Sequence, residues 1–479
     1  MEQIRVKDIL KATGGKLLFG EEETLLSRIK LDSRQVEEGD LFVPIIGEKV
    51  DAHRFLEQVI RSGAGAVFTS EHTGEEAEKA MVKLNGEGSC KTAWIGVPDT
   101  REALQAVGSY CRARLSIPVI GITGSVGKTT TREMVAAALS AGFQVFKTPG
   151  NSNSQVGVPI TMSEICSSDE AAVIELGMSE PGELTKIARI ARPTMALITN
   201  IGITHIEQLG SRENIYREKL TIQDGLEAGG ILLLNGDDDL LKVTKARDGY
   251  RTIYYGTGKN CDYRAENINE EGGCPSFLAV YKDKKVPVQL QVLGSHNVLN
   301  AMAAIAAACE AGLSMEAAAE SVGCFTGFKN RQQIYRNHGI TVIDDTYNAS
   351  PVSMKAGINV LCALKEGRRK IAVLADMKEL GEDTVQFHRE VGAYLAEQPV
   401  DVLITYGELA GEIAEGAAME AGENGRLVIR RFSENERETM TAFLEGFLTA
   451  GDCVLLKGSN SMKLGTIAAQ FAGKKNQVI

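Results

Sequence analysis

The sequence predicts an α/β protein of three domains with parallel sheets, and three observations lead to this prediction. The chain has 479 residues, which is too long for one hydrophobic core and corresponds to about three domains of ordinary size. Short apolar segments rich in β-branched residues alternate with helical segments, as in parallel sheets covered by helices. This alternation begins anew along the chain, so we expect domains at residues 1–97, 98–328 and 329–479.

Composition and charge argue against several classes of protein. The net charge of −11 argues against a general binder of nucleic acids or of membrane surfaces, because either would need a basic face. The nine cysteines form no Cys-x-x-Cys pair, so neither a zinc site nor a disulfide framework is expected. We find no apolar signal core and no segment long enough to span a membrane. We therefore expect a cytoplasmic protein, which we take to be a monomer although no residue fixes its oligomeric state.

The first domain is predicted to be a small α/β unit with two polar loops. Helices are expected at residues 6–12 and 52–61, and strands at 40–44 and 66–68. The loops contain Ser33, Arg34, Gly47 and His53. An arginine beside a serine can hold a phosphate or can simply solvate a turn, and the residue types alone favour the turn.

A glycine-rich turn opens the second domain, between a predicted strand at 118–120 and a helix at 132–139. Small residues allow backbone N–H groups to surround a polyphosphate, and the N-terminus of the helix adds its own donors. Lys128 is expected to reach the outer phosphates, and the Thr129 hydroxyl to bind magnesium. A purely structural turn is the alternative, since a strict Walker pattern has glycine where this chain has Ile122. The candidate phosphate-binding residues are Gly124, Ser125, Gly127, Lys128, Thr129 and Thr130.

Polar residues follow the next predicted strands of this domain. Glu175 follows a strand at 172–174 and His205 comes soon after one at 195–198. Because ligands gather outside the carboxyl ends of parallel strands, both side chains are candidates for one cleft. A carboxylate there can bind magnesium, although capping and structural roles are alternatives. Lys219 lies on a predicted helix, where a lysine is usually solvated.

Two further polar groups lie near the boundary between the second and third domains. Asn297 and Asn300 open an alanine-rich helix, where they can cap the helix or can read an adenine edge. In the third domain, Asp344 and Asp345 follow a predicted buried strand. Paired acids there are costly unless they bind hydroxyls, cations or backbone donors. Because the third domain is expected to be a second doubly wound sheet, the two sheets suggest a cleft that closes.

Taken together, these motifs resemble the Mur ligase family, over nearly the whole chain. The motifs occur in the family's order: Thr-Gly-Ser-x-Gly-Lys-Thr-Thr from Thr123, Glu-Leu-Gly from Glu175, His205 with Lys219 fourteen positions later, Gly-x-His-Asn-x-x-Asn from Gly294, and Asp-Asp-x-Tyr-Asn-Ala-x-Pro from Asp344. Residues 151–153, 347–349 and 376–381 are most similar to the member that adds D-alanyl-D-alanine to UDP-N-acetylmuramoyl-tripeptide.

The resemblance implies an ADP-forming peptide ligase of peptidoglycan precursor synthesis that uses ATP and two Mg²⁺ ions and proceeds through an acyl phosphate. It also implies a UDP-sugar domain, a central P-loop ATPase domain with a parallel sheet, and a Rossmann-like C-terminal domain. For the phosphates and metals, the resemblance implies phosphate binding by Lys128 and its turn, one metal site at Thr129 and Glu175, a second at Glu175 and His205, and a carbamate on Lys219 as a further metal ligand. For the rest of ATP, it implies that Asn297 and Asn300 contact the adenine, that Asp345 contacts the ribose, and that Arg331 contacts the phosphates. For the other substrate, it implies that Ser33, Arg34 and the Gly47 to His53 loop bind the UDP-sugar.

Two residues differ from the family's pattern, and two other functions are alternatives to the one that the resemblance implies. Ala52 and Asn460 stand where glycine and arginine are common in the family, and an asparagine offers no charged fork for a dipeptide carboxylate. A ligase similar to folylpolyglutamate synthase would lack a comparable N-terminal module. A nucleotide-switched binding protein would leave Lys219 and Asp345 unexplained. No residue identifies the third amino acid of the tripeptide.

Overall fold

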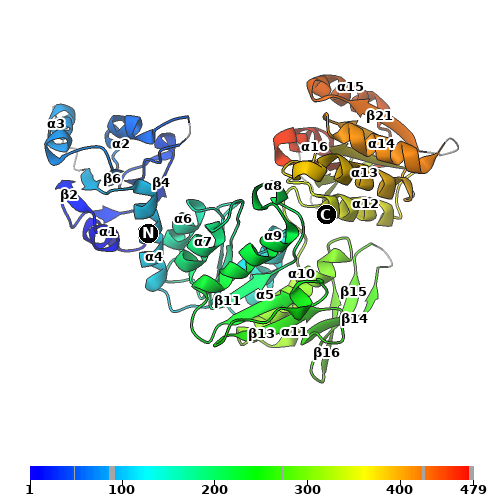
Figure 1. Cartoon of the computed structure of the whole chain (residues 1–479), viewed down its shortest axis with the longest axis horizontal. Helices are drawn as coiled ribbons and strands as arrows, with labels where there is room; N and C mark the ends of the chain where they lie inside the picture. Colours follow the sequence, from blue (N-terminus) through cyan, green and yellow to red (C-terminus); the bar gives the residue numbers. More distant parts are fainter. Residues whose placement is uncertain (48, 86–91, 271–272, 423–426, 474–479) are drawn as a thin grey trace.

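The computed structural model describes residues 1–47, 49–85, 92–270, 273–422 and 427–473, which form three lobes in chain order (Figure 1). Each lobe contains a sheet with helices packed around it, and most strand pairs in these sheets are parallel. The predicted α/β class is therefore confirmed. Within the described residues, no helix is both long enough and apolar enough to cross a membrane.

The N-terminal lobe, drawn in blue in Figure 1, has a five-stranded sheet. In sheet order the strands are β2 (Lys16–Phe19), β7 (Ala93–Gly96), β6 (Ala66–Thr69), β5 (Leu41–Phe42) and β4 (Ile29–Lys30), with a separate pair of β1 (Ile4–Arg5) and β3 (Leu25–Leu26). The helices are α1 (Val6–Thr13), α2 (Leu56–Arg61) and α3 (Gly74–Asn85). The helix expected at 52–61 begins as a 3-10 turn, Ala52–Phe55, and continues as α2.

The central lobe has a nine-stranded sheet. Its strands, in sheet order, are β16 (Lys284–Gln289), β15 (Ser276–Tyr281), β14 (Tyr263–Asn269), β13 (Arg251–Gly256), β12 (Ile231–Asn235), β11 (Met195–Ile198), β8 (Val119–Thr123), β10 (Ala171–Glu175) and β9 (Val145–Lys147). The helices are α4 (Thr100–Ala113), α5 (Lys128–Leu139), α6 (Gly157–Glu164), α7 (Glu183–Ala191), α8 (Ile206–Leu209), α9 (Arg212–Leu220), α10 (His296–Glu310) and α11 (Met315–Gly323).

One edge of the central sheet differs from the expected repeat of strand and helix. Strand β15 runs antiparallel to both of its neighbours, β14 and β16. The two residues between β15 and β16 make a hairpin in which Lys282 has a positive φ of 52°. Such a short connection can join only antiparallel strands, because a parallel pair needs a long crossover.

The C-terminal lobe has a six-stranded sheet in which only β17 is antiparallel to its neighbour. The strands in sheet order are β17 (Gln333–Asn337), β18 (Ile340–Asp345), β22 (Asp452–Lys457), β19 (Arg369–Ala375), β20 (Val402–Tyr406) and β21 (Val428–Phe432). The helices are α12 (Pro351–Ala363), α13 (Thr384–Ala396), α14 (Ala410–Ala421), α15 (Arg437–Phe447) and α16 (Leu464–Ala472).

Helix α4 joins the N-terminal and central lobes through a shared apolar core. Its residues Leu104 and Val107 are buried together with Val6 of α1, and Ile160 of α6 packs against the same cluster. The helices α4 and α6 approach so closely that a Cβ on Gly108 would lie 2.5 Å from Pro159 Cα. The predicted domain boundary near residue 97 falls just before this helix and stays a prediction.

Candidate functional site

A cavity of about 790 Å³ lies between the central and C-terminal lobes. Its central wall includes the glycine-rich turn before α5 and residues at the carboxyl ends of β10, β11 and β12. Its other wall comes from residues 325–334 and from the segment that follows β18. A ligand in this cavity would therefore contact both lobes. Among the residues predicted for ATP and metal binding, all but Gly124 and Lys219 line the cavity.

The glycine-rich turn has the backbone conformation that its sequence requires. Gly124 and Gly127 have φ angles of +148° and +86°, where other residues are strained. A Cβ on Gly124 would lie 1.8 Å from Thr199 Oγ1. Asn200 Oδ1 accepts a hydrogen bond of 3.0 Å from the Val126 N–H. The turn is therefore fixed against the residues that follow β11, and it leads directly into the N-terminus of α5.

Lys128 lies folded over this turn. Its Nζ donates a hydrogen bond of 2.7 Å to the Gly124 carbonyl oxygen. Burial lowers the pKa of Lys128, and the nearby charge of Glu175 opposes that shift. The amine is thus held where outer phosphates would meet the positive end of α5.

Thr129 and Glu175 provide two oxygen donors side by side. Thr129 Oγ1 donates to Glu175 Oε2 at 3.1 Å, and both residues are buried. The same carboxylate accepts 3.2 Å and 2.9 Å hydrogen bonds from Arg132 Nη1 and Asn153 Nδ2. A hydroxyl and a carboxylate beside a phosphate-binding turn are suitable ligands for Mg²⁺. These residues therefore fit a magnesium ion.

Arg132 and Asn153 were missed as members of the site. Arg132 lies four residues after Lys128, on the same face of α5. That spacing, with a glycine-rich turn before it, could have marked Arg132 as a neighbour of the phosphate site.

Lys219 is buried, with 1% of its surface exposed, so the solvated position typical of a lysine is wrong for this residue. Within the described part of the chain, its Nζ makes no hydrogen bond or ion pair, while Glu218 accepts from the backbone N–H groups of Gly182 and Leu184. Burial lowers the pKa of Lys219 well below its usual value, and the positive charge of Lys128 adds to this shift. A neutral amine in this position is a nucleophile.

His205 lies between the two lobes, at the residue before α8. Its Nδ1 is 2.6 Å from Oε2 of Glu379, which belongs to the C-terminal lobe. Burial lowers the pKa of His205, and the charge of Glu379 opposes the shift, whereas Lys128 and Lys219 reinforce it. The structure thus brings His205 to the same cavity as Lys128 and Glu175.

Asn297 and Asn300 connect the start of α10 to neighbouring elements. Asn297 Nδ2 donates to the Leu293 carbonyl oxygen at 2.8 Å, and Asn300 Nδ2 donates to Asn297 Oδ1 at 2.9 Å. Thr131 Oγ1 donates to Asn300 Oδ1 at 3.0 Å. Each amide group has two N–H donors, so a structural role and contact with a ligand are compatible here.

Arg331 and Asp345 reach the cavity from the C-terminal side. Arg331 Nη2 donates to Thr129 Oγ1 at 3.1 Å, and its guanidinium lies 3.8 Å from the centroid of the Tyr347 ring. Among the described residues, the buried Arg331 Nε has no hydrogen-bond partner, which leaves a donor for a phosphate. Asp345 Oδ2 pairs with Lys457 Nζ at 2.7 Å, so a ligand hydroxyl at Asp345 would share the carboxylate with this lysine.

The residues predicted for UDP-sugar binding lie apart from this cavity, in the N-terminal lobe. Ser33 Oγ donates to Gln58 Oε1 at 3.5 Å. Arg34 makes hydrogen bonds of 2.9 Å and 2.7 Å to Asp32, which lower the pKa of Asp32 to about 2. The Arg34 side chain is 81% exposed. The N–H of Gly47 donates to the Val50 carbonyl oxygen, and residue 48 of this loop lies outside the described residues.

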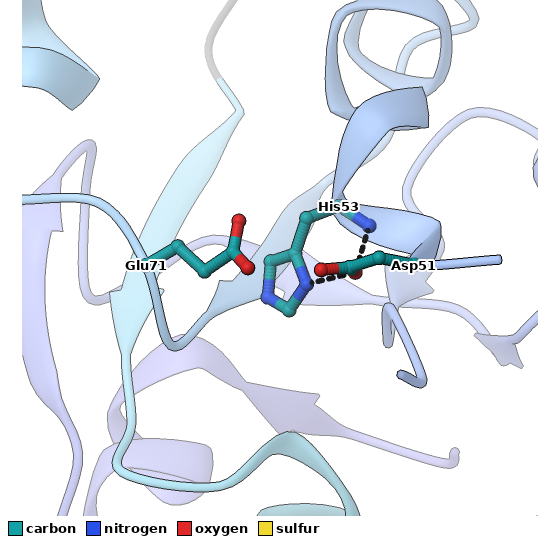
Figure 2. A group of neighbouring side chains, drawn as sticks. All are labelled: Asp51, His53 and Glu71. Carbon is teal, nitrogen blue, oxygen red and sulfur yellow. Dashed lines mark hydrogen bonds and ion pairs between the residues drawn. The ribbon is translucent and has the colours of Figure 1, made fainter. Parts of the chain in front are cut away.

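His53 is buried between two carboxylates, Asp51 and Glu71 (Figure 2). The three side chains offer ligand atoms within 4.8 Å of one another. However, His53 Nδ1 is 2.6 Å from Asp51 Oδ1, and Nε2 accepts a 3.2 Å hydrogen bond from the Ser70 N–H. Because both nitrogens are engaged, the ring has no free lone pair for a metal. The imidazole instead connects the loop to the residues after β6.

Family models match all three parts of the chain. "Mur ligase family, catalytic domain" matches residues 26–110, "Mur ligase middle domain" matches residues 122–308, and "Mur ligase, glutamate ligase domain" matches residues 330–460. The matches together extend over most of the described sequence and include the glycine-rich turn, Glu175, His205 and Lys219.

Curated relatives and solved structures match almost the whole chain. The UDP-N-acetylmuramoyl-tripeptide–D-alanyl-D-alanine ligase of Bacillus subtilis is 37% identical, with 96% of this chain and 97% of the relative covered. The ligase of the same name from Synechocystis is 34% identical, with 94% and 93% covered. A crystal structure of MurF from Acinetobacter baumannii is 30% identical, has a TM-score of 0.86, and covers 98% and 99% of the two chains. The Thermotoga maritima MurF ligase in complex with ADP is 26% identical, has a TM-score of 0.79, and covers 94% and 98%.

Proposed function

The chain belongs to the Mur ligase family, and from this premise we propose that it joins D-alanyl-D-alanine to UDP-N-acetylmuramoyl-tripeptide at the expense of ATP. The observation that carries the proposal is the gathering of Lys128, Thr129 and Glu175 in one cleft that Arg331 enters from the C-terminal lobe. The relatives named for this reaction match nearly the full length of the chain. We further propose that the enzyme acts as a cytoplasmic monomer.

The reaction begins with activation of a carboxylate, which is by itself a poor acyl donor. A carboxylate oxygen of the tripeptide attacks the γ-phosphorus of ATP, ADP leaves, and an acyl phosphate forms. The amine of the dipeptide then attacks the acyl carbon, the bond to phosphate breaks, and the amine loses a proton. Lys128 and the N–H groups of the turn would hold the phosphates and stabilise charge during both steps.

We propose two magnesium sites, which the oxygen and nitrogen donors around the turn support. Thr129 and Glu175 would hold one ion, and Glu175 and His205 would contribute to the second. When bound, the ions supply charge neutralisation for the phosphates. The buried amine of Lys219 can add to CO₂ and lose a proton, which gives an anionic carbamate oxygen as a further ligand.

The remaining predicted residues would bind ATP and the UDP-sugar part of the tripeptide substrate. We propose that Asn297 and Asn300 contact adenine, that Asp345 contacts the ribose, and that Arg331 contacts the phosphates. In the N-terminal lobe, Ser33, Arg34 and Gly47 would bind the UDP-sugar. Since both nitrogens of His53 are engaged within the protein, we propose that His53 acts by holding its loop.

The test is phosphate release from ATP in the presence of Mg²⁺, D-alanyl-D-alanine and UDP-N-acetylmuramoyl-tripeptide. Tripeptides that end in lysine and in diaminopimelate are assayed side by side, because the third residue is not specified. We expect release only when both the tripeptide and the dipeptide are present. Release with folate and glutamate instead would contradict the proposal, as would nucleotide-dependent binding of a protein without any ligation.

A further inference from the structure

Glu379 of the C-terminal lobe faces the imidazole of His205 across the cleft. We propose that Glu379 is a positioning residue, which holds Nδ1 of His205 so that Nε2 is free to bind a metal only when the C-terminal lobe is docked. This inference rests on the proposed function, because it concerns the metal site of that reaction.

The first support is the contact itself. His205 Nδ1 and Glu379 Oε2 are 2.6 Å apart, although Nδ1 has no partner with hydrogen-bond geometry among the described residues. The Glu379 side chain is 50% exposed, so a rotation of its carboxylate can align the pair. Histidines that bind metals generally donate their other ring N–H to a carboxylate or carbonyl.

The second support is the backbone on both sides of the contact. His205 and Glu379 have φ angles of +65° and +63°, which are costly for residues other than glycine. Gly381 has a φ of +66°, and a Cβ there would lie 3.5 Å from the Cα of Glu207 in α8. Two unfavourable backbone conformations thus meet at one place, where the lobes touch.

The third support is the anchoring of the segment that carries Glu379. Asp376 Oδ1 accepts a 2.7 Å hydrogen bond from the Ala410 N–H, and the Asp376 carbonyl oxygen accepts one from Ser459. The Met377 N–H donates to His388 Nε2 at 3.0 Å. Since this segment is fixed to its own sheet, Glu379 moves with the whole C-terminal lobe. Movement of the lobe away from α8 would leave His205 without the carboxylate.

The experiment compares Glu379→Ala and Glu379→Gln with Glu382→Ala, a control that removes an exposed acid from the same segment. Two measurements are made on the full chain: the Mg²⁺ dependence of phosphate release, and Mn²⁺ binding in the presence of ADP by electron paramagnetic resonance. We expect Glu379→Ala to raise the Mg²⁺ concentration needed for half-maximal phosphate release, and to weaken Mn²⁺ binding, each by about tenfold or more. Glu379→Gln should retain part of the affinity, because its amide oxygen still accepts a hydrogen bond.

The inference and the proposed function are tested by different outcomes. Wild-type Mn²⁺ affinity in Glu379→Ala would overturn the inference, and so would equal losses in Glu379→Ala and Glu382→Ala, since these would reflect net charge alone. A wild-type chain without ligase activity would refute the proposed function, whereas a selective loss of Mn²⁺ binding in Glu379→Ala would still support the positioning role. Thermal melting of each variant verifies that it is folded.

Discussion

The surroundings of Lys219 determine whether its amine is protonated, and therefore how it can react. In water its amine would be protonated at neutral pH, whereas here burial and the charge of Lys128 favour the neutral form. Only the neutral form can add to CO₂. Because an unpaired charge is unfavourable in a buried position, burial of Lys219 costs stability. The same burial favours the neutral amine, which is the reactive form.

We predict that Lys219→Ala lowers the rate of phosphate release by about 100-fold or more, because the variant cannot form the proposed anionic ligand for a magnesium ion that stabilises the phosphates. Short carboxylates such as formate or acetate should restore part of the rate by occupying the vacated position. Lys242→Ala, at an exposed lysine, serves as the control and should retain full activity. Full activity of Lys219→Ala would rule out the carbamate role.

The sequence could not predict the burial of Lys219 from its own helix. Helix α9 contains charged residues on several faces, so its pattern does not reveal which face packs against the lobe. Glu175 and His205 were easier to predict, because each follows a strand whose end is fixed by the parallel sheet. The partner of His205 came from another lobe, and no local pattern connects residues 205 and 379.

Among the elements, the glycine-rich turn depends on two specific glycines. We predict that Gly124→Ala weakens ADP binding more than tenfold, because the new Cβ would collide with Thr199 Oγ1. Gly150→Ala is a matched control, since Gly150 also has a positive φ but no atom lies within 4 Å of its Cβ position. The control should cost about 1 kcal/mol of stability and leave ADP binding unchanged. Calorimetric titration with ADP measures the affinity of each variant for ADP, and urea unfolding measures its stability. Equal ADP affinities in the two variants would contradict the prediction.

An ion pair at the start of two C-terminal strands provides a test of stability. Asp452 of β22 is 1% exposed and accepts hydrogen bonds from Arg369 Nε at 2.9 Å and from the Thr449 N–H at 2.8 Å. Burial alone would raise the pKa of Asp452, but these hydrogen bonds lower it below the usual value. The ionised form therefore stabilises the native state above the unfolded pKa of about 3.9.

We predict that Asp452→Asn lowers the free energy of unfolding by about 1.5–3 kcal/mol at neutral pH, because the hydrogen bonds to a charged carboxylate are lost. The difference from wild type should decrease as the pH falls below about 4 through the lowered native pKa, because the native carboxylate is then protonated. Urea unfolding at several pH values measures this. Glu438→Gln, at an exposed acid of the same lobe, should show little change; a difference for Asp452→Asn that is independent of pH would contradict the ionic explanation.

Several strands could be predicted because apolar runs of β-branched residues end in polar residues, as at Met195–Ile198, where the predicted bounds are confirmed. The antiparallel edge was not predicted. Its signal was present in two alternating segments separated by Lys282 and Asp283, but the repeating pattern of strand and helix before it favoured another crossover. Short local turns can override such a repeat.

For the molecule as a whole, the carboxylate of the candidate metal site is held by hydrogen bonds within the protein. Glu175 is already hydrogen-bonded to Arg132 and Asn153. We predict that EDTA abolishes phosphate release while the melting temperature of the nucleotide-free chain stays unchanged, and that added Mg²⁺ restores activity. Scanning fluorimetry and the phosphate assay measure the two effects. A large fall in melting temperature with EDTA would instead indicate a structural metal.

The packing of Gly108 against Pro159 has a consequence for which substrates can be used. Because α4 and α6 share a core with the N-terminal lobe, we expect the loops around Ser33 and Arg34 to keep their distance from the glycine-rich turn. If those loops hold one end of the proposed substrate, its other end can reach Lys128 only when the length of the substrate matches this span. We therefore expect a larger residue at Gly108, whose Cβ would lie 2.5 Å from Pro159 Cα, to shift the two lobes and so to alter which substrate lengths are accepted.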